Sequence, residues 1–139
     1  MIQIEKINDE AILYYRIHST YYKYSKNPEI VPKSCFKPMP EDGDEMSVWW
    51  AEKITPEQVK ALAENPKENR IVKMKALDVR SIKNINNLDE KAFSVEHTPY
   101  HTNPPHPSHA GVCGWKKYSL AEKNKYKAKF QQISSWIII

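Results

Sequence analysis

The side chains best suited to catalysis or metal binding are concentrated in one short segment of the sequence. Four of the five histidines fall within thirteen residues and are followed by a cysteine. Neutral imidazole and thiolate are good zinc ligands, and an ion held by three or four of them would stiffen a proline-rich segment. One interpretation is a zinc site whose ligands are drawn from His97, His101, His106, His109 and Cys113.

Two other interpretations of the histidine segment stay open. The spacing matches no known zinc finger or ribbon, and the prolines exclude the helical His-Glu-x-x-His motif of metalloproteases. One or two imidazoles would instead transfer protons near neutral pH, with His97 and His109 as candidates because each lies where a predicted strand meets the loop. Alternatively, the histidines only stack on prolines and tyrosines of a surface loop, and Cys113 is a small buried residue.

A second group of reactive side chains lies on an early predicted strand. Residues 11–18 are rich in β-branched and aromatic side chains, and a period of two places Arg16 and His18 on one face. The planar guanidinium of Arg16 is suited to a phosphate or carboxylate, and His18 would act beside it as an acid or base. The alternative is structural: a polar face in water, or an ion pair between Arg16 and an acidic residue.

Other catalytic motifs are absent from the sequence. Ser34, Cys35 and Ser47 are nucleophiles by residue type alone, because no Gly-x-Ser-x-Gly turn and no cysteine-protease signature surrounds them. The whole chain has three glycines, so neither a phosphate-binding loop nor a dinucleotide-binding fingerprint can be written. These absences argue against P-loop kinases and Rossmann dehydrogenases.

The positive charge of the chain is local. The formal net charge is +4, and six lysines against one glutamate lie between Lys116 and Lys129. In one interpretation the stretch binds nucleic acid, with the lysines contacting phosphates and the nearby tyrosines and tryptophan stacking on bases. The preferred interpretation is an amphipathic helix whose lysine stems cover the edges of a buried face.

Hydrophobic periodicity predicts an α+β fold: a mixed or antiparallel sheet of about five strands, two main helices and long Pro-rich loops. A capping box opens each helix, at Thr55–Gln58 and at Ser119–Glu122, and the second helix places Tyr126, Phe130, Ile133 and Ile137 on one face. The length fits a single domain spanning 1–139. The predicted strands are 11–18, 46–50, 70–79, 92–97 and 109–115, with a short strand at 34–36; loops are expected at 25–40, 81–90 (or a poor helix) and 98–108.

Composition also bears on the compartment. Only two cysteines are present, no charged-then-apolar leader precedes the first polar residues, and no apolar run approaches about 18 residues. We therefore expect a cytoplasmic protein that does not contact a membrane. The apolar tail Trp136–Ile139 would be buried in the core or would pack against a second copy in a homodimer.

The order of several short motifs resembles that of a family of small uncharacterised bacterial proteins. The shared motifs are a Tyr-Arg-Ile-His strand, a Phe-Lys-Pro followed by an acidic turn, a Ser-Val-x-Trp segment, and Asn-Pro-x-His-x-x-His-Ala-x-Val-x-Gly. The family has no established activity, but the resemblance adds Ser34 to Arg16, His18 and His109 as residues of interest. In this chain the motifs lie at Tyr15–His18, Phe36–Pro38, Ser47–Trp50 and Asn103–Gly114.

An arginine on an early strand followed by a serine on a later strand is also similar to the nicotinamide-binding layout of ADP-ribosyltransferase-like folds. The third element of that layout is a catalytic glutamate, and Glu96 is the residue on a late strand that would serve. This resemblance concerns fold and layout, and fold alone does not carry function.

The sequence hypothesis is therefore a small enzyme acting on a nucleotide or other phosphate-bearing substrate. Arg16, with Ser34, would bind the substrate, and His18, His97 and His109 would transfer protons. One alternative is a non-enzymatic interaction module of a defence or toxin system. Another is a zinc-stabilised nucleic-acid-binding domain.

Overall fold

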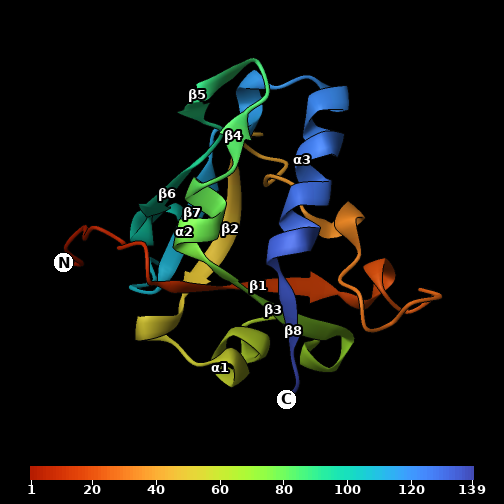
Figure 1. The fold of residues 1–139 in the computed structure, drawn as a ribbon. Coiled ribbons are helices and arrows are strands. Elements are labelled where there is room, and N and C mark those ends of the chain that lie inside the picture. Colours follow the sequence, from red (N-terminus) through yellow and green to blue (C-terminus); the bar gives the residue numbers. More distant parts are fainter.

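The computed structural model describes residues 1–139 and has an α+β architecture built on a six-stranded antiparallel sheet (Figure 1). The strand order is β6-β7-β2-β1-β3-β8, and a separate hairpin pairs β4 with β5. The predicted fold class is confirmed, with one more strand in the main sheet than expected. The strands are β1 Ile12–His18, β2 Glu45–Trp50, β3 Asn69–Lys75, β4 Lys83–Asn84, β5 Asn87–Lys91, β6 Ser94–His97, β7 His109–Cys113 and β8 Ser135–Ile137; the helices are α1 Pro56–Ala61, α2 Ala76–Arg80 and α3 Leu120–Ile133.

One face of the sheet carries the main hydrophobic core. Alternate residues of the strands point to it, and α3 covers it with Tyr126 and Phe130, both almost fully buried. Phe130 stacks on Phe36 and Trp115 at centroid distances of 5.7 and 5.3 Å. The core comprises 24 buried residues, which is enough apolar surface to hold the strands in one register.

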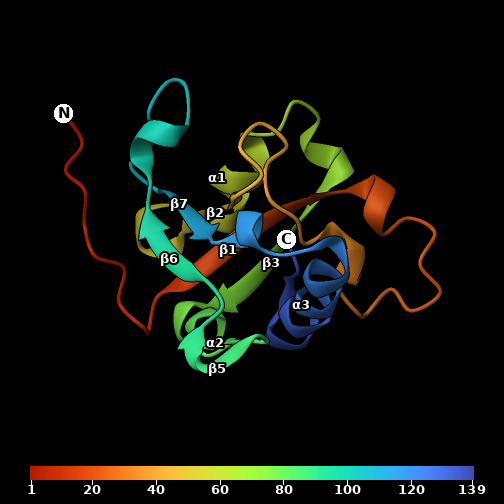
Figure 2. The same ribbon diagram turned by 90° about the horizontal axis from the view of Figure 1, so that it is seen from above.

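The opposite face of the sheet has a smaller apolar cluster and a polar region. Helix α1 packs Val59 against Trp49 and Ile71 on this side. Seen from above, α1 and α3 lie on opposite sides of β1 and β3 (Figure 2). Both predicted capping boxes are present, since Thr55 and Ser119 accept from the backbone of Gln58 and Glu122 while those side chains reach back.

Several predicted elements differ in the structure. The strand predicted at 70–79 ends at Lys75, because Ala76 and Leu77 donate to the backbone of the segment before β1 and the chain turns into α2. Residues 81–90 contain the β4–β5 hairpin and not an irregular loop. Residues 33–35 form a 3-10 turn in place of the short strand predicted at 34–36.

The end of the chain also differs from its prediction. Helix α3 stops at Ile133, and β8 pairs with β3 through Ile137–Ile71 and Trp136–Val72. Ile137 therefore belongs to the sheet and not to the helical face, while Ile138 is 96% exposed. No helix of the protein combines the length and the apolar character needed to cross a membrane.

Candidate active site

The polar region lies on β2 and β7, on the face opposite the core. The antiparallel register places Glu45 opposite Cys113, Ser47 opposite Gly111 and Trp49 opposite His109. These residues alternate with Met46, Val48, Ala110 and Val112, which are fully buried in the core. Because side chains alternate along a strand, one pair of strands presents an apolar face to α3 and a polar face to the loop that follows β6.

The centre of this region is a hydrogen-bonded pair, Ser47 and His109. The Ser47 Oγ lies 2.5 Å from His109 Nε2. On the other side of the ring, His109 Nδ1 lies 2.9 Å from the Thr98 carbonyl oxygen and 3.0 Å from its Oγ1. A carbonyl oxygen only accepts, so Nδ1 carries the proton and Nε2 accepts the hydrogen bond of the Ser47 hydroxyl.

The surroundings keep the His109 imidazole neutral. The side chain is almost fully buried, and this burial lowers its pKa from the ordinary value of a histidine. The Thr98 hydrogen bond and the negative charge of Glu45 act in the opposite direction but do not outweigh burial. A neutral imidazole with a free acceptor facing a hydroxyl is the arrangement that general-base chemistry requires.

A buried carboxylate lies beside this pair. Glu45 is 2% exposed, and its Oε2 lies 2.9 Å from Nδ1 of His101, which comes from the Pro-rich loop. Gly111 makes room for it, since a Cβ at that position would overlap the Glu45 carboxylate. Gly111 of β7 pairs with Ser47 of β2 on one side and with Glu96 of β6 on the other, so the three residues form one row across three strands.

The Pro-rich loop is ordered by contacts with this face. The ring of Trp49 meets the rings of His106 and His109 edge to face, at centroid distances of 5.2 and 5.1 Å. The Ser108 hydroxyl lies 2.7 Å from His106 Nδ1. His106 thus packs against the same Trp49 ring as His109, and Thr98 at the start of the loop fixes the tautomer of His109.

Neither cysteine is a nucleophile in this environment. Burial raises the pKa of Cys113 to about 12, and the carboxylates of Glu45 and Asp44 add to the effect. Burial likewise raises the pKa of Cys35 to about 12, and this residue is 2% exposed in the core. Because the thiolate is the reactive form, Ser47 is the nucleophile by type that the structure pairs with a base.

The five predicted zinc ligands do not converge. His97 points to the core face, where it meets the ring of Trp50, and its two nitrogens contact the Glu5 amide and the Pro107 carbonyl. His97 pairs with Ala110, and His109 is the next residue along β7. Because neighbouring residues of a strand point to opposite faces, His109 lies on the face opposite His97. Nowhere in the structure do three histidine, cysteine or carboxylate side chains gather so as to hold a metal ion.

The residues predicted on the early strand separate in a similar way. Arg16 is half-buried on the same face as Ser47, and its Nη1 donates to the Val59 carbonyl at 3.3 Å. His18 is exposed and caps the next turn by accepting from the Thr20 amide. Ser34 is exposed in a turn on the core side, where the Tyr15 hydroxyl donates to the Cys35 carbonyl, so it lies across the sheet from Arg16.

Sequence reasoning singled out His109 but not its partners. The sequence marks Ser47 as a nucleophile by residue type alone and assigns no role to Thr98 or Glu45. A partial signal was available: Met46 and Val48, and Ala110 and Val112, alternate with residues that are not aliphatic, so each strand has one apolar face and one face free for other side chains. Two predicted strands with this period place their polar residues together only if they pair, and pairing is decided by the fold.

No family model matches the chain, and neither a curated protein nor a solved structure shows significant similarity to it. The resemblance noted above rests on its short motifs.

Proposed function

We propose that the protein is an enzyme acting on a nucleotide, with Ser47 and His109 at its catalytic centre. The observation that carries the proposal is the Ser47–His109–Thr98 chain of hydrogen bonds, in which a neutral imidazole accepts from a serine hydroxyl. His109 holds the serine hydroxyl in one orientation. It takes the proton when the Ser47 oxygen, or a substrate hydroxyl in its place, attacks as a nucleophile.

Arg16 supports a phosphate-bearing substrate. It shares the face of Ser47, on the neighbouring strand, and its guanidinium is bonded to a single backbone carbonyl. The β1–β2 ladder consists of the pairs Leu13–Trp50 and Tyr14–Trp49, beyond which the two strands separate. A phosphate bound where β1 and β2 separate would accept hydrogen bonds from the remaining N–H groups of Arg16.

Carboxylates near Ser47 favour chemistry at the sugar of the nucleotide. Glu96 lies in the row that contains Ser47 and Gly111, and the Glu45 carboxylate reaches over Gly111 from the next row, so both would repel a phosphate placed directly over them. Negative groups of this kind stabilise the positive charge that develops on a ribose carbon when its glycosidic bond breaks. The resemblance to the layout of ADP-ribosyltransferase-like folds, with arginine on β1, serine on β2 and glutamate on β6, agrees with this assignment.

The test is turnover of a nucleotide panel that includes nicotinamide adenine dinucleotide, followed by chromatography of the released base. We expect Ser47→Ala and His109→Gln to lower the rate at least about 100-fold, and Arg16→Gln to act mainly on KM. Ser34→Ala is the matched control, since Ser34 is exposed on the other side of the sheet, and it should keep full activity. The absence of turnover across the panel, or full activity of Ser47→Ala, would overturn the proposal.

A further inference from the structure

The largest cleft of the molecule lies away from Ser47, beside the β3–β8 edge of the sheet. It has a volume of about 940 Å³ and is bounded by the segment after β1, the end of α3 and β8. Arg70, on β3, is opposite Ile17, whose side chain is in the main core. The cleft therefore reaches the core side of the sheet, while Lys60 of α1 lines it from the opposite side. Ser47 and His109 lie on β2 and β7, and β1 separates these strands from the β3–β8 edge.

Arg70 is held in this cleft without an acidic partner. Its guanidinium lies over the ring of Tyr22, 4.4 Å from the centroid, and 5.5 Å from the ring centroid of Trp136. Trp136 is itself fixed, because its Nε1 donates to the Pro28 carbonyl at 3.1 Å. No carboxylate forms an ion pair with Arg70, so two aromatic rings orient a planar fork whose N–H groups remain available.

Other groups around the cleft also suit an anion. Lys60 and Lys67 line it, and neither takes part in an ion pair, whereas Glu29 is the one acidic residue of the lining. Ser134 lines the cleft as well, and its hydroxyl oxygen is buried without a hydrogen-bond partner. A buried hydroxyl without a partner is costly, so this end of the lining is a polar position that the protein itself leaves unsatisfied.

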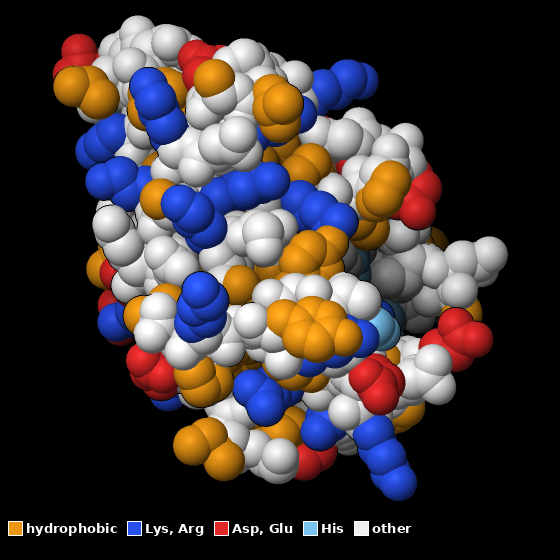
Figure 3. All heavy atoms as spheres, turned by 90° about the vertical axis from the view of Figure 1, so that its right-hand side faces the viewer, with side chains coloured by type: hydrophobic (Ala, Val, Ile, Leu, Met, Phe, Trp, Pro, Cys, Tyr) orange, Lys and Arg blue, Asp and Glu red, His pale blue; other side chains and the backbone are white.

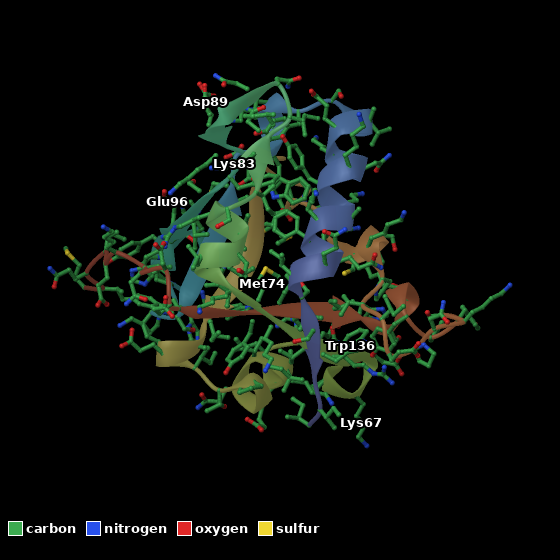
Figure 4. The ribbon with its side chains drawn as sticks, viewed as in Figure 1. Lys67, Met74, Lys83, Asp89, Glu96 and Trp136 are labelled. Carbon is green, nitrogen blue, oxygen red and sulfur yellow. The ribbon has the colours of Figure 1, made fainter.

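The cations extend over more surface than one phosphate group needs. Lys60, Lys67 and Arg70 come from α1, the turn before β3, and β3 itself. Lys67 and Trp136 lie at the same lower end of the molecule (Figure 4). The side shown in Figure 3 carries Lys and Arg side chains across its surface, interleaved with hydrophobic ones, and its acidic side chains lie mainly at the rim.

We propose that this cleft binds single-stranded nucleic acid. Arg70 takes one phosphate in bidentate fashion, Lys60 and Lys67 take neighbouring phosphates, and the apolar lining around Ile30 and Ile138 receives base surface. The strand is favoured over a mononucleotide because three cations without ion-pair partners, from three elements, are more than the single phosphate of a mononucleotide needs. This site is independent of the nucleotide chemistry proposed for Ser47.

The experiment measures fluorescence anisotropy of labelled twelve-residue oligo-dT and oligo-U with the full chain at 50 and 200 mM salt. Three phosphate contacts predict a slope of about −2 in a plot of log affinity against log salt. Arg70→Gln should weaken binding roughly tenfold, and Lys67→Gln somewhat less. Lys83→Gln, which removes the same charge at the far end of the molecule (Figure 4), is the matched control and should change affinity less than about twofold.

Several results would overturn the proposal. They are no binding at 50 mM salt, an equal loss in Lys83→Gln and Arg70→Gln, or competition by dTMP as effective as that by the unlabelled strand. Thermal melting of each variant checks that it is folded, and Lys67→Gln, an exposed change, keeps the test valid if Arg70→Gln does not fold. Ser47→Ala should bind the strand normally and Arg70→Gln should turn over nucleotide normally, so failure of one proposal is distinguishable from failure of the other.

Discussion

Both faces of β2 and β7 contain buried side chains, but the two faces are stabilised in different ways. On the core face Met46, Val48 and Val112 are fully buried among apolar side chains. On the other face Glu45 and His109 are 2% and 1% exposed, and each has hydrogen-bond partners from the Pro-rich loop or the neighbouring strand. Apolar packing therefore stabilises one face of these two strands, and hydrogen bonds between buried polar groups stabilise the other.

This difference indicates which face tolerates change. Apolar burial is non-directional, so the core face depends mainly on filled volume. A buried polar group costs free energy unless it is hydrogen-bonded, so the other face depends on the positions of particular partners. We therefore expect core substitutions to act on stability, and substitutions at Gly111 or His109 to act on geometry, charge and pH response.

The largest effect on stability should come from Phe130→Ala. The Phe130 ring is fully buried and stacks with Phe36 and Trp115, and truncation of such a ring should lower the free energy of unfolding by about 4 kcal/mol. Urea denaturation measures it. Leu120→Ala, at a side chain 73% exposed in the same helix, should change it by less than about 0.5 kcal/mol. Equal effects of the two changes would contradict the assignment of α3 to the core.

A smaller loss, of about 2 kcal/mol, should follow from Gly111→Ala, because the added Cβ would overlap the Glu45 carboxylate. The group that must move is the buried Glu45 carboxylate, which is surrounded by protein and held by His101. In a double-mutant cycle measured by urea denaturation, Glu45→Ala should remove much of the penalty of Gly111→Ala. If the two losses are simply additive, the carboxylate does not occupy the space over Gly111.

The smallest effect should be a pH dependence of stability through His109. Burial lowers the pKa of His109 in the folded protein, so between that pKa and the ordinary value near 6.5 the unfolded chain binds more protons. The free energy of unfolding should then rise with pH over this interval, by at most about 1.4 kcal/mol per pH unit, and the gain is lost as pH falls.

His109→Gln isolates this contribution from the other groups that face the ring, which are Glu45, His101 and His106. Denaturant titrations at closely spaced pH values between 5 and 7.5 should show a flatter profile for the variant than for the wild type. Identical profiles would mean that His109 is not the buried neutral group on this face.

The predictions from the sequence were confirmed for elements that a local residue pattern specifies. The strand at 11–18 and the two capping boxes were confirmed, because β-branched runs and cap residues act over a few neighbours. The errors lie where long-range contacts override local preference. Residues 76–80 leave the strand for α2 to bond with the segment before β1, and Ile137 leaves the helical period to pair with Ile71.

The α+β class and the clustering of histidines can be predicted from the sequence, since residue type and period are properties of the local chain. Which histidines meet depends on how the strands pair. A period of two along β6 and the register with β7 send His97 into the core and His109 to the other face, and β2 brings Ser47 to His109 from 62 residues away. Partners so distant in the chain are chosen by the burial of a whole sheet, which no short motif encodes.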